Sequence, residues 1–226
     1  MTSLVHRLKV TVLALAGFAA TFATPVAAQT ASPAKGAPLK IVAFGDSLTA
    51  GYGLSAQDAF PAVLERALKA KGHNVEIENA GVSGDTASGG LARLDWSIAD
   101  GTDAVIVELG ANDMLRGVEP KVTRQALDDI LAKLKARNIP VLLSGMRAAP
   151  NMGPDYLREY EAIFPALAQK YDVVFYPFFL DGVAADPKLA LRDGVHPNGA
   201  GVQIIVDGIL PKVEELIARV RSRTPS

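Results

Sequence analysis

The chain has 226 residues, 49% of them hydrophobic, which is enough for one domain with a large core. Its formal net charge of −1 at pH 7 gives no reason to expect nucleic acid or an anionic membrane surface as a partner. Because the chain contains no cysteine, disulfides, cysteine nucleophiles and thiolate metal sites are all excluded.

The first 28 residues are typical of a secretory signal peptide. Arg7 and Lys9 precede an apolar stretch over 10–24, and small residues at 26–28 suit cleavage after Ala28. The apolar stretch is shorter than the ~20 residues that a membrane span requires, and no cysteine follows that could carry a lipid. We therefore expect a protein secreted to the periplasm with no stable membrane anchor, whose mature form has a formal net charge of −3.

Residues 29–38 are rich in Ala, Ser, Thr, Pro and Gly and predict a flexible mature N-terminus, so the folded domain is expected over 39–226. In this domain apolar, strand-like runs alternate with amphipathic helical patterns. The expected strands are Lys40–Phe44, Val75–Asn79, Ala104–Leu109, Val141–Ser144 and Val173–Tyr176. The expected helices are Asp58–Lys71, Gly90–Ile98, Pro120–Arg137, Pro154–Lys170 and Gly199–Val220. This order predicts an α/β fold, a three-layer αβα sandwich around a five-stranded, parallel, doubly wound sheet.

Four long segments follow expected strands and are candidates for function. They are Gly81–Gly89, Gly110–Glu119, Met146–Gly153 and Phe178–Asn198. Because parallel strands end at the same edge of a sheet, these segments should gather at that edge, where open α/β sheets bind ligands. Ser47 belongs to the same edge, since Gly45-Asp46-Ser47-Leu48 follows the first strand directly. A serine becomes a nucleophile only when a base takes its proton.

Only three histidines could supply that base. His6 lies in the expected signal peptide, and His73 lies in a helix-to-strand turn at the opposite edge of the sheet. His196 falls at the same edge as Ser47, and Asp193 is near enough in sequence to orient the imidazole. We therefore predict Ser47 as nucleophile, His196 as general base and Asp193 as the residue that orients it.

Attack on a carbonyl group also needs hydrogen-bond donors for the oxyanion. Asn112, in Gly110-Ala111-Asn112-Asp113, offers a side-chain amide at this edge, and Gly84 and Ser47 offer backbone N–H groups. Each has a plainer interpretation as a turn residue, and their shared location favours the oxyanion hole. The glycine patterns of dinucleotide and phosphate sites are absent, and no His and carboxylate cluster suits a metal. We expect neither a metal nor a cofactor.

These motifs resemble those of a known family. The block at 45–48, Gly84, the block at 110–113 and the block at 193–196 occur in the order found in GDSL, or SGNH, hydrolases, and the resemblance runs from about Leu39 to the last helix. It is closest to the bacterial periplasmic acyl-CoA thioesterase I/lysophospholipase and arylesterase members. The resemblance implies a flavodoxin-like fold and an acyl-enzyme on the predicted serine. It also implies a small acyl ester or thioester as substrate, and we expect a monomer.

The resemblance also implies a substrate-binding loop over Arg147, Ala148, Ala149 and Pro150. Close relatives have a Leu-Pro pair where this chain has Ala148-Ala149, a difference that bears on acyl-chain length. Two alternatives stay open. One is an O-acetyl esterase acting on carbohydrate or peptidoglycan, for which Trp96 is the only tryptophan available to stack on sugar. The other is an exported binding protein that uses the cleft without catalysis.

Overall fold

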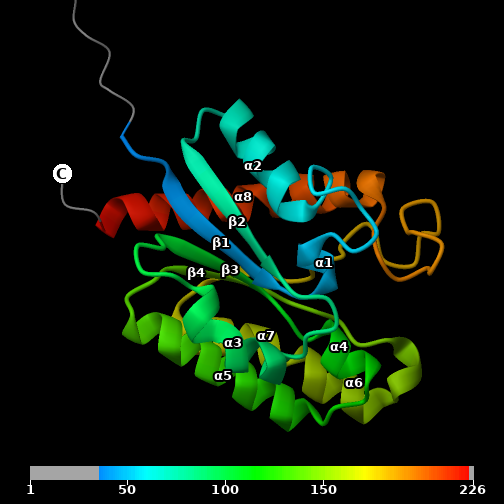
Figure 1. Ribbon diagram of the computed structural model, residues 1–226. Coiled ribbons are helices and arrows are strands. Elements are labelled where there is room, and N and C mark those ends of the chain that lie inside the picture. The colour runs from blue at the N-terminus through cyan, green and yellow to red at the C-terminus, as the bar shows by residue number, and fades with distance from the viewer. Residues whose placement is uncertain (1–35, 224–226) are drawn as a thin grey trace, which may run out of the picture. The chain divides into compact units, whose positions relative to one another are not determined.

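Five parallel strands form one sheet in the order β2-β1-β3-β4-β5 in the computed structural model, which describes residues 36–223 (Figure 1). The strands are β1 (Leu39–Gly45), β2 (Val75–Gly81), β3 (Ala104–Glu108), β4 (Val141–Ser144) and β5 (Val174–Tyr176). All five expected strands are present, with ends that differ by two residues or fewer. The expected signal peptide, 1–28, and all of the expected N-terminal segment except 36–38 lie outside the described residues.

Helices cover both faces of the sheet, which confirms the predicted three-layer α/β fold. The helices α2 (Phe60–Ala70) and α8 (Gly199–Arg223) pack together on one face. The helices α3 (Ala87–Ser97), α5 (Pro120–Ala136) and α7 (Ile163–Tyr171) cover the other (Figure 1). The interior strand β1 is buried on both faces from Ile41 to Gly45, as expected for a parallel strand between two helical layers.

The structure corrects several element boundaries. The expected helix Pro154–Lys170 is two helices, α6 (Pro154–Glu161) and α7, which meet at Ala162. Pro165 explains the break, because it has no N–H to donate to the Glu161 carbonyl and cannot continue α6. Two expected loops contain helix, since α3 begins at Ala87 and α4 occupies Ala111–Leu115.

Two further short helices lie near the carboxyl ends of the strands. They are α1 (Ser47–Ala50), directly after β1, and a 3₁₀ turn, η1, at Pro150–Met152. Helices this short give no periodic pattern in a sequence, so they were not predicted.

The strand order determines where a ligand can bind. From β1 the chain winds to β2 on one side and later to β3 on the other, so the direction of winding reverses between β1 and β3. Such a reversal opens a crevice beyond the carboxyl ends of the two strands. Ser47 follows β1 and Asn112 follows β3, so both residues lie at this crevice. Within 36–223, no helix combines the length and apolar character needed to cross a membrane.

Candidate active site

Ser47 is held at the turn from β1 into α1. The turn requires Gly45, because a Cβ there would lie 2.1 Å from Thr49 Oγ1 and 2.6 Å from the Glu108 carbonyl oxygen. Asp46 then caps α1, with Oδ1 accepting a hydrogen bond of 2.9 Å from Leu48 N–H. These contacts fix the backbone on both sides of Ser47, whose side chain faces the crevice beside His196.

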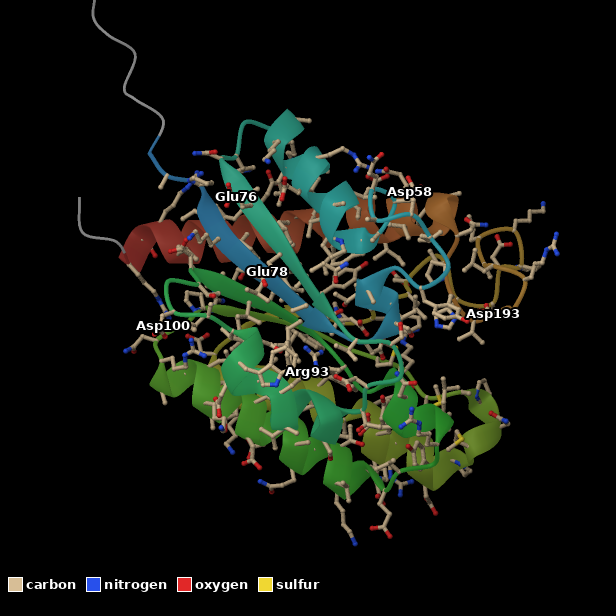
Figure 2. All side chains as sticks on the ribbon, in the orientation of Figure 1. Asp58, Glu76, Glu78, Arg93, Asp100 and Asp193 are labelled. Atoms are coloured by element: carbon tan, nitrogen blue, oxygen red, sulfur yellow. The ribbon has the colours of Figure 1, made fainter. Side chains whose placement is uncertain are left out.

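His196 and Asp193 reach Ser47 from the loop between β5 and α8. His196 Nε2 lies 2.9 Å from Ser47 Oγ, and His196 Nδ1 lies 2.7 Å from Asp193 Oδ2. Asp193 Oδ1 accepts the backbone N–H groups of His196 and Val195 at 3.0 and 2.9 Å. Figure 2 shows Asp193 at the end of the sheet opposite to Asp100, which precedes β3.

The hydrogen bonds of Asp193 also determine its charge. Donation from the backbone N–H groups of His196 and Val195, together with the imidazole, lowers the pKa of Asp193 to about 2. The carboxylate is therefore ionised at neutral pH. It accepts a hydrogen bond from His196 Nδ1, which carries the ring proton. That tautomer leaves the Nε2 lone pair facing the Ser47 hydroxyl, which is the orientation a general base needs.

An aromatic ring that the sequence analysis missed supports the imidazole. The ring centroids of Tyr52 and His196 are 4.5 Å apart, with 37° between the planes. Tyr52 is 53% exposed, so its ring covers His196 on the solvent side. The only sequence signal is an aromatic residue in the turn after α1, which is too common a feature to identify a function.

The three predicted oxyanion donors differ in how clearly they are placed. Asn112 Nδ2 donates to Asp46 Oδ2 at 2.9 Å, and its amide has a second N–H. The Ser47 N–H lies at the start of α1, where helical N–H groups have no intrahelical acceptor. Gly84 lies in the loop after β2 with φ +85°, and its carbonyl accepts from Arg116 at 2.7 Å.

Ser47 and Asn112 line an apolar cavity of about 360 Å³ at the crevice. All four residues of the predicted substrate-binding loop, Arg147 to Pro150, line it, whereas Gly84 does not. The other lining residues are Leu48, Ala111, Met114, Leu115, Met146, Phe178, Leu180, Ala184, Ala185, Gly194, Val195 and His196. The lining is mostly aliphatic, with the serine and histidine at one part of the wall, and this composition suits a hydrocarbon chain.

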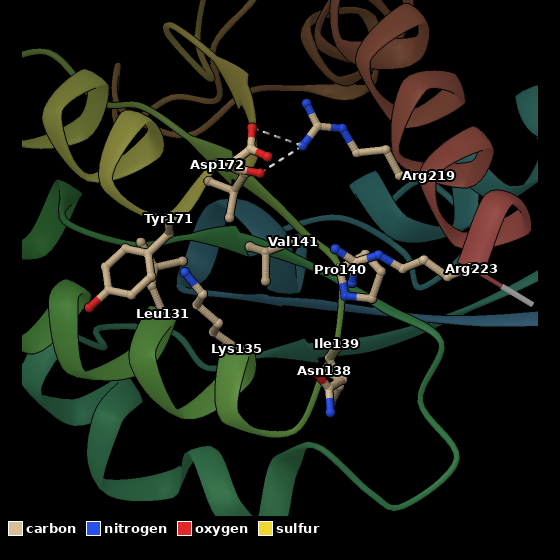
Figure 3. A pocket seen from close by; sticks show the side chains of 11 residues that line it. Leu131, Lys135, Asn138, Ile139, Pro140, Val141, Tyr171, Asp172, Arg219 and Arg223 are labelled. Atoms are coloured by element: carbon tan, nitrogen blue, oxygen red, sulfur yellow. Dashed lines mark hydrogen bonds and ion pairs between the residues drawn. The ribbon is translucent and has the colours of Figure 1, made fainter.

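A cavity of about 460 Å³ lies at the amino ends of β4 and β5, away from all predicted site residues (Figure 3). There Arg219 donates to the Asp172 carbonyl at 2.7 Å. His73 also lies at the amino end of a strand, before β2, where its Nε2 is 3.0 Å from Glu214 Oε1. Between residues 36 and 223, His, Asp and Glu side chains form no group of three or more that could hold a metal ion.

Known proteins resemble this chain over most of its length. The model of the GDSL-like lipase/acylhydrolase family matches residues 43–204. Thioesterase 1/protease 1/lysophospholipase L1 of Escherichia coli K12 is 39% identical over 78% of this chain and 84% of its own. Esterase TesA of Pseudomonas aeruginosa is 35% identical over 78% of this chain and 89% of its own. The crystal structure of AlinE4, an SGNH-hydrolase family esterase, is 49% identical and covers 80% of this chain and 98% of its own, with a TM-score of 0.69.

Proposed function

We propose that this chain, which belongs to the GDSL-like lipase/acylhydrolase family and is a carboxylic ester hydrolase, works through an acyl-enzyme on Ser47. The observation that carries the proposal is the continuous hydrogen-bonded series Ser47 Oγ, His196 and Asp193, with spacings of 2.9 and 2.7 Å, at the wall of an apolar cavity. A binding protein has no need of an ionised carboxylate that orients a base toward a serine.

The first half of the reaction acylates the serine. Ser47 Oγ attacks the carbonyl carbon of the ester while its proton passes to His196 Nε2, and Asp193 stabilises the imidazolium. The carbonyl oxygen becomes an oxyanion, for which the Asn112 amide and the Ser47 and Gly84 N–H groups are the proposed donors. His196 then returns its proton to the leaving alcohol or thiol as the carbon–oxygen or carbon–sulfur bond breaks.

The second half repeats these steps with water. His196 takes a proton from a water molecule that attacks the acyl carbonyl, and the second tetrahedral intermediate collapses. The ester bond to Ser47 breaks, His196 returns the proton to Ser47 Oγ, and the carboxylic acid leaves. Every proton transfer uses the same Nε2 atom, which is why its 2.9 Å distance to Ser47 matters.

For the substrate we propose small acyl esters and thioesters, of the arylesterase, thioesterase and lysophospholipase type. The cavity lining supports an acyl group rather than a sugar, because Met146, Phe178 and Leu180 offer hydrocarbon contacts. Trp96, the residue available for sugar stacking, is 75% exposed on α3 and does not line the cavity. We also propose export to the periplasm through residues 1–28, with Gln29 as the first mature residue, which N-terminal sequencing of the secreted protein would test.

Labelling with a fluorophosphonate probe tests the nucleophile directly. We expect the probe to modify Ser47 in the wild-type protein, as located by peptide mass spectrometry, and to leave Ser47→Ala unlabelled. The same variant should show no measurable turnover of p-nitrophenyl butyrate, with its circular dichroism spectrum unchanged. Labelling at another serine, or wild-type rates in Ser47→Ala, would refute the assignment.

A rate profile tests the substrate class. We expect kcat/KM for p-nitrophenyl esters to rise from acetyl to a medium chain length and then fall as the chain outgrows the cavity of about 360 Å³. An acyl-CoA and a lysophospholipid would be assayed beside the ester series. Higher activity on acetylated xylan or acetylated peptidoglycan than on any acyl ester would favour the O-acetyl esterase instead.

A further inference from the structure

Two buried carboxyl groups lie directly behind Ser47 and take no part in the mechanism above. Asp46 precedes the serine and is 0% exposed, and Glu108 is the last residue of β3 and is 1% exposed. In the pairing of β1 with β3, Gly45 lies opposite Glu108, which brings the two acids together. Asp46 N–H donates to Glu108 Oε2 at 3.4 Å. Carboxyl groups are rarely buried without a specific reason.

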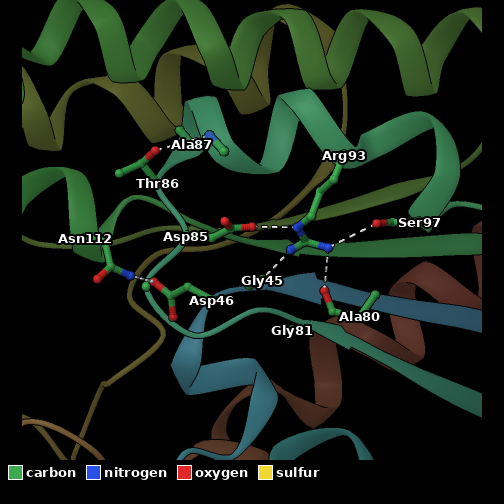
Figure 4. Close-up of polar contacts among 12 residues, drawn as sticks. Gly45, Asp46, Ala80, Gly81, Asp85, Thr86, Ala87, Arg93, Ser97 and Asn112 are labelled. Carbon is green, nitrogen blue, oxygen red and sulfur yellow. Dashed lines mark hydrogen bonds and ion pairs between the residues drawn. The ribbon is translucent and has the colours of Figure 1, made fainter.

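The hydrogen bonds show which of the four carboxyl oxygens can carry a proton. Both Asp46 oxygens accept N–H groups at 2.9 Å, Oδ1 from Leu48 and Oδ2 from Asn112. Figure 4 shows the contact with Asn112. Glu108 Oε2 accepts from Thr49 Oγ1 at 2.7 Å. Glu108 Oε1 has no partner among residues 36–223, whereas the other three oxygens each accept at least one donor, so Oε1 is the oxygen best suited to carry a proton.

The neighbouring strand carries a second buried polar atom without a partner among the described residues. Ser144 lies opposite Glu108 in the register of β3 and β4, so the two side chains leave the same face of the sheet. Ser144 Oγ is the other buried side-chain polar atom without a partner in the described part of the chain. Neither Glu108 Oε1 nor Ser144 Oγ has a hydrogen-bond partner within 36–223, and no hydrogen bond joins the two. A neutral Glu108 is therefore favoured, because a buried charge whose Oε1 has no donor costs more than a buried neutral acid.

Electrostatics lead to the same distribution of charge. Two carboxylates in contact inside a protein cannot both stay ionised at neutral pH. Burial raises the pKa of Asp46 to about 6, and burial together with the nearby Asp46 charge raises the pKa of Glu108 well above its ordinary value. At pH 7 the pair therefore carries one negative charge, which the N–H donors hold on Asp46.

We propose that Asp46 is the positioning residue of the oxyanion hole, whose carboxylate fixes the Asn112 amide while Glu108 stays protonated beside it. The proposal rests on the function given above, in which Asn112 is an oxyanion donor. One N–H of Asn112 is bound to Asp46 Oδ2, and the amide plane thereby directs the second N–H. Because Asp46 also caps α1, a single side chain ties the nucleophile to its oxyanion donor.

A double-mutant cycle on p-nitrophenyl butyrate hydrolysis tests the coupling. In Asp46→Asn an amide cannot accept from both Leu48 and Asn112, so we expect kcat to fall roughly tenfold to a hundredfold with KM changed less than about twofold. In the Asn112→Ala background, which itself loses roughly 10²–10³ in kcat, the same substitution should cost less than about threefold. Equal losses in the two backgrounds, or a single-variant loss below twofold, would overturn the proposal.

Two more variants separate positioning from folding. Asp46→Ser keeps a side chain that can cap α1 but is too short to reach Asn112, so we expect the Asp46→Asn loss to recur. Asp113→Asn is the matched control, because Asp113 is equally buried and adjacent to Asn112 but accepts from Ala87 and Thr123. Its effect on kcat should be the same factor with and without Asn112.

Infrared difference spectra test the proton on Glu108. We expect a protonated carboxyl C=O band at pH 7 in the wild-type protein that is missing in Glu108→Gln and present in Asp46→Asn. Absence of the band from the wild-type protein would overturn the proton assignment. Ser47→Ala is assayed alongside: activity in that variant would refute the proposed function, whereas an inactive Ser47→Ala with a fully active Asp46→Asn would refute the positioning role alone.

Discussion

Asp193 and Asp46 both lie near Ser47, but Asp193 is exposed to solvent and Asp46 is buried. Asp193 stands in an exposed loop, and backbone N–H donors lower its pKa to about 2. Asp46 is fully buried at the end of β1, and burial raises its pKa to about 6. The residue type is the same and the pKa shifts are opposite, so the surroundings determine what each carboxyl group can do. In the proposed mechanism the exposed carboxylate orients the base, and the buried one lies at the strand ends beside Asn112, a proposed oxyanion donor.

The largest effect is expected on the exposed side, from Asp193→Asn. Asparagine can still accept the Val195 and His196 backbone N–H groups, but its Nδ2 would face His196 Nδ1 in place of the carboxylate. The ring would then take the tautomer with the proton on Nε2, which cannot accept from Ser47. We expect kcat to fall about 10³–10⁴-fold, as in other triads, with Tm unchanged within a few degrees. A loss below tenfold would show that Asp193 only shapes the loop.

The second effect concerns stability and comes from the buried side. Since the Asp46 pKa is raised on folding, the folded state binds more protons than the unfolded state between about pH 4 and pH 6, and the free energy of unfolding declines as pH rises through that window. The Asp193 pKa is lowered, so its contribution is present above its ordinary pKa and is lost as pH falls toward 2. Tm measured from pH 2 to 8 should show both slopes.

Asp46→Asn should make the decline between pH 4 and 6 shallower. The share of Asp46 amounts to at most about 3 kcal/mol, or roughly 6–10 °C in Tm, and should be lost, whereas the share of Glu108, whose pKa burial also raises, should remain. The loss of stability below pH 4 should remain, because Asp193 and the other carboxylates with lowered pKa are unchanged. An identical Tm profile in wild type and variant would contradict the raised pKa of Asp46.

The exposed half of this site was far easier to predict from sequence than the buried half. Four of the five strands are mostly apolar runs and β2 alternates apolar and acidic residues, and helical patterns separate the strands, so the α/β fold and the edge that carries Ser47 could be predicted. Of three histidines only His196 falls at that edge, and the structure places it 2.9 Å from Ser47. The break between α6 and α7 was not predicted, although Pro165 is a signal for it in the sequence.

The buried acids could not be predicted in the same way. Glu108 stands in an apolar run, and its contact with Asp46 depends on β3 being the neighbour of β1, which the alternation of strands and helices does not specify. The orientation of the Asn112 amide depends on its hydrogen bond to Asp46, which no pattern in the sequence indicates. Gly84 was expected at the edge on a motif, but the backbone alone determines where its N–H points, and its role stays a prediction.

A smaller loss of stability, without a loss of catalysis, is expected from Thr49→Val. The Thr49 hydroxyl donates a hydrogen bond of 2.7 Å to Oε2 of buried Glu108, and an isosteric valine would remove that donor. We expect the free energy of unfolding to drop by about 1–2 kcal/mol, or roughly 3–6 °C in Tm, with kcat within about twofold of wild type. Thr123→Val is the matched control at the other buried acid, Asp113, and should cost a similar amount. A large kcat loss in Thr49→Val alone would mean that the buried acids act on catalysis through α1 rather than through Asn112.

The smallest loss of kcat is expected at Tyr52, which supports His196 only by ring packing. Tyr52 contacts His196 through its ring, with centroids 4.5 Å apart. Tyr52→Ala should therefore let the imidazole sample other rotamers and lower kcat about threefold, while Tyr52→Phe, which keeps the ring, should stay at the wild-type value. Asp193 still holds Nδ1 in both variants, which limits the loss. Equal losses in the Phe and Ala variants would instead assign the effect to the Tyr52 hydroxyl, and a loss as large as that of Asp193→Asn would show that packing, not the exposed carboxylate, orients the base.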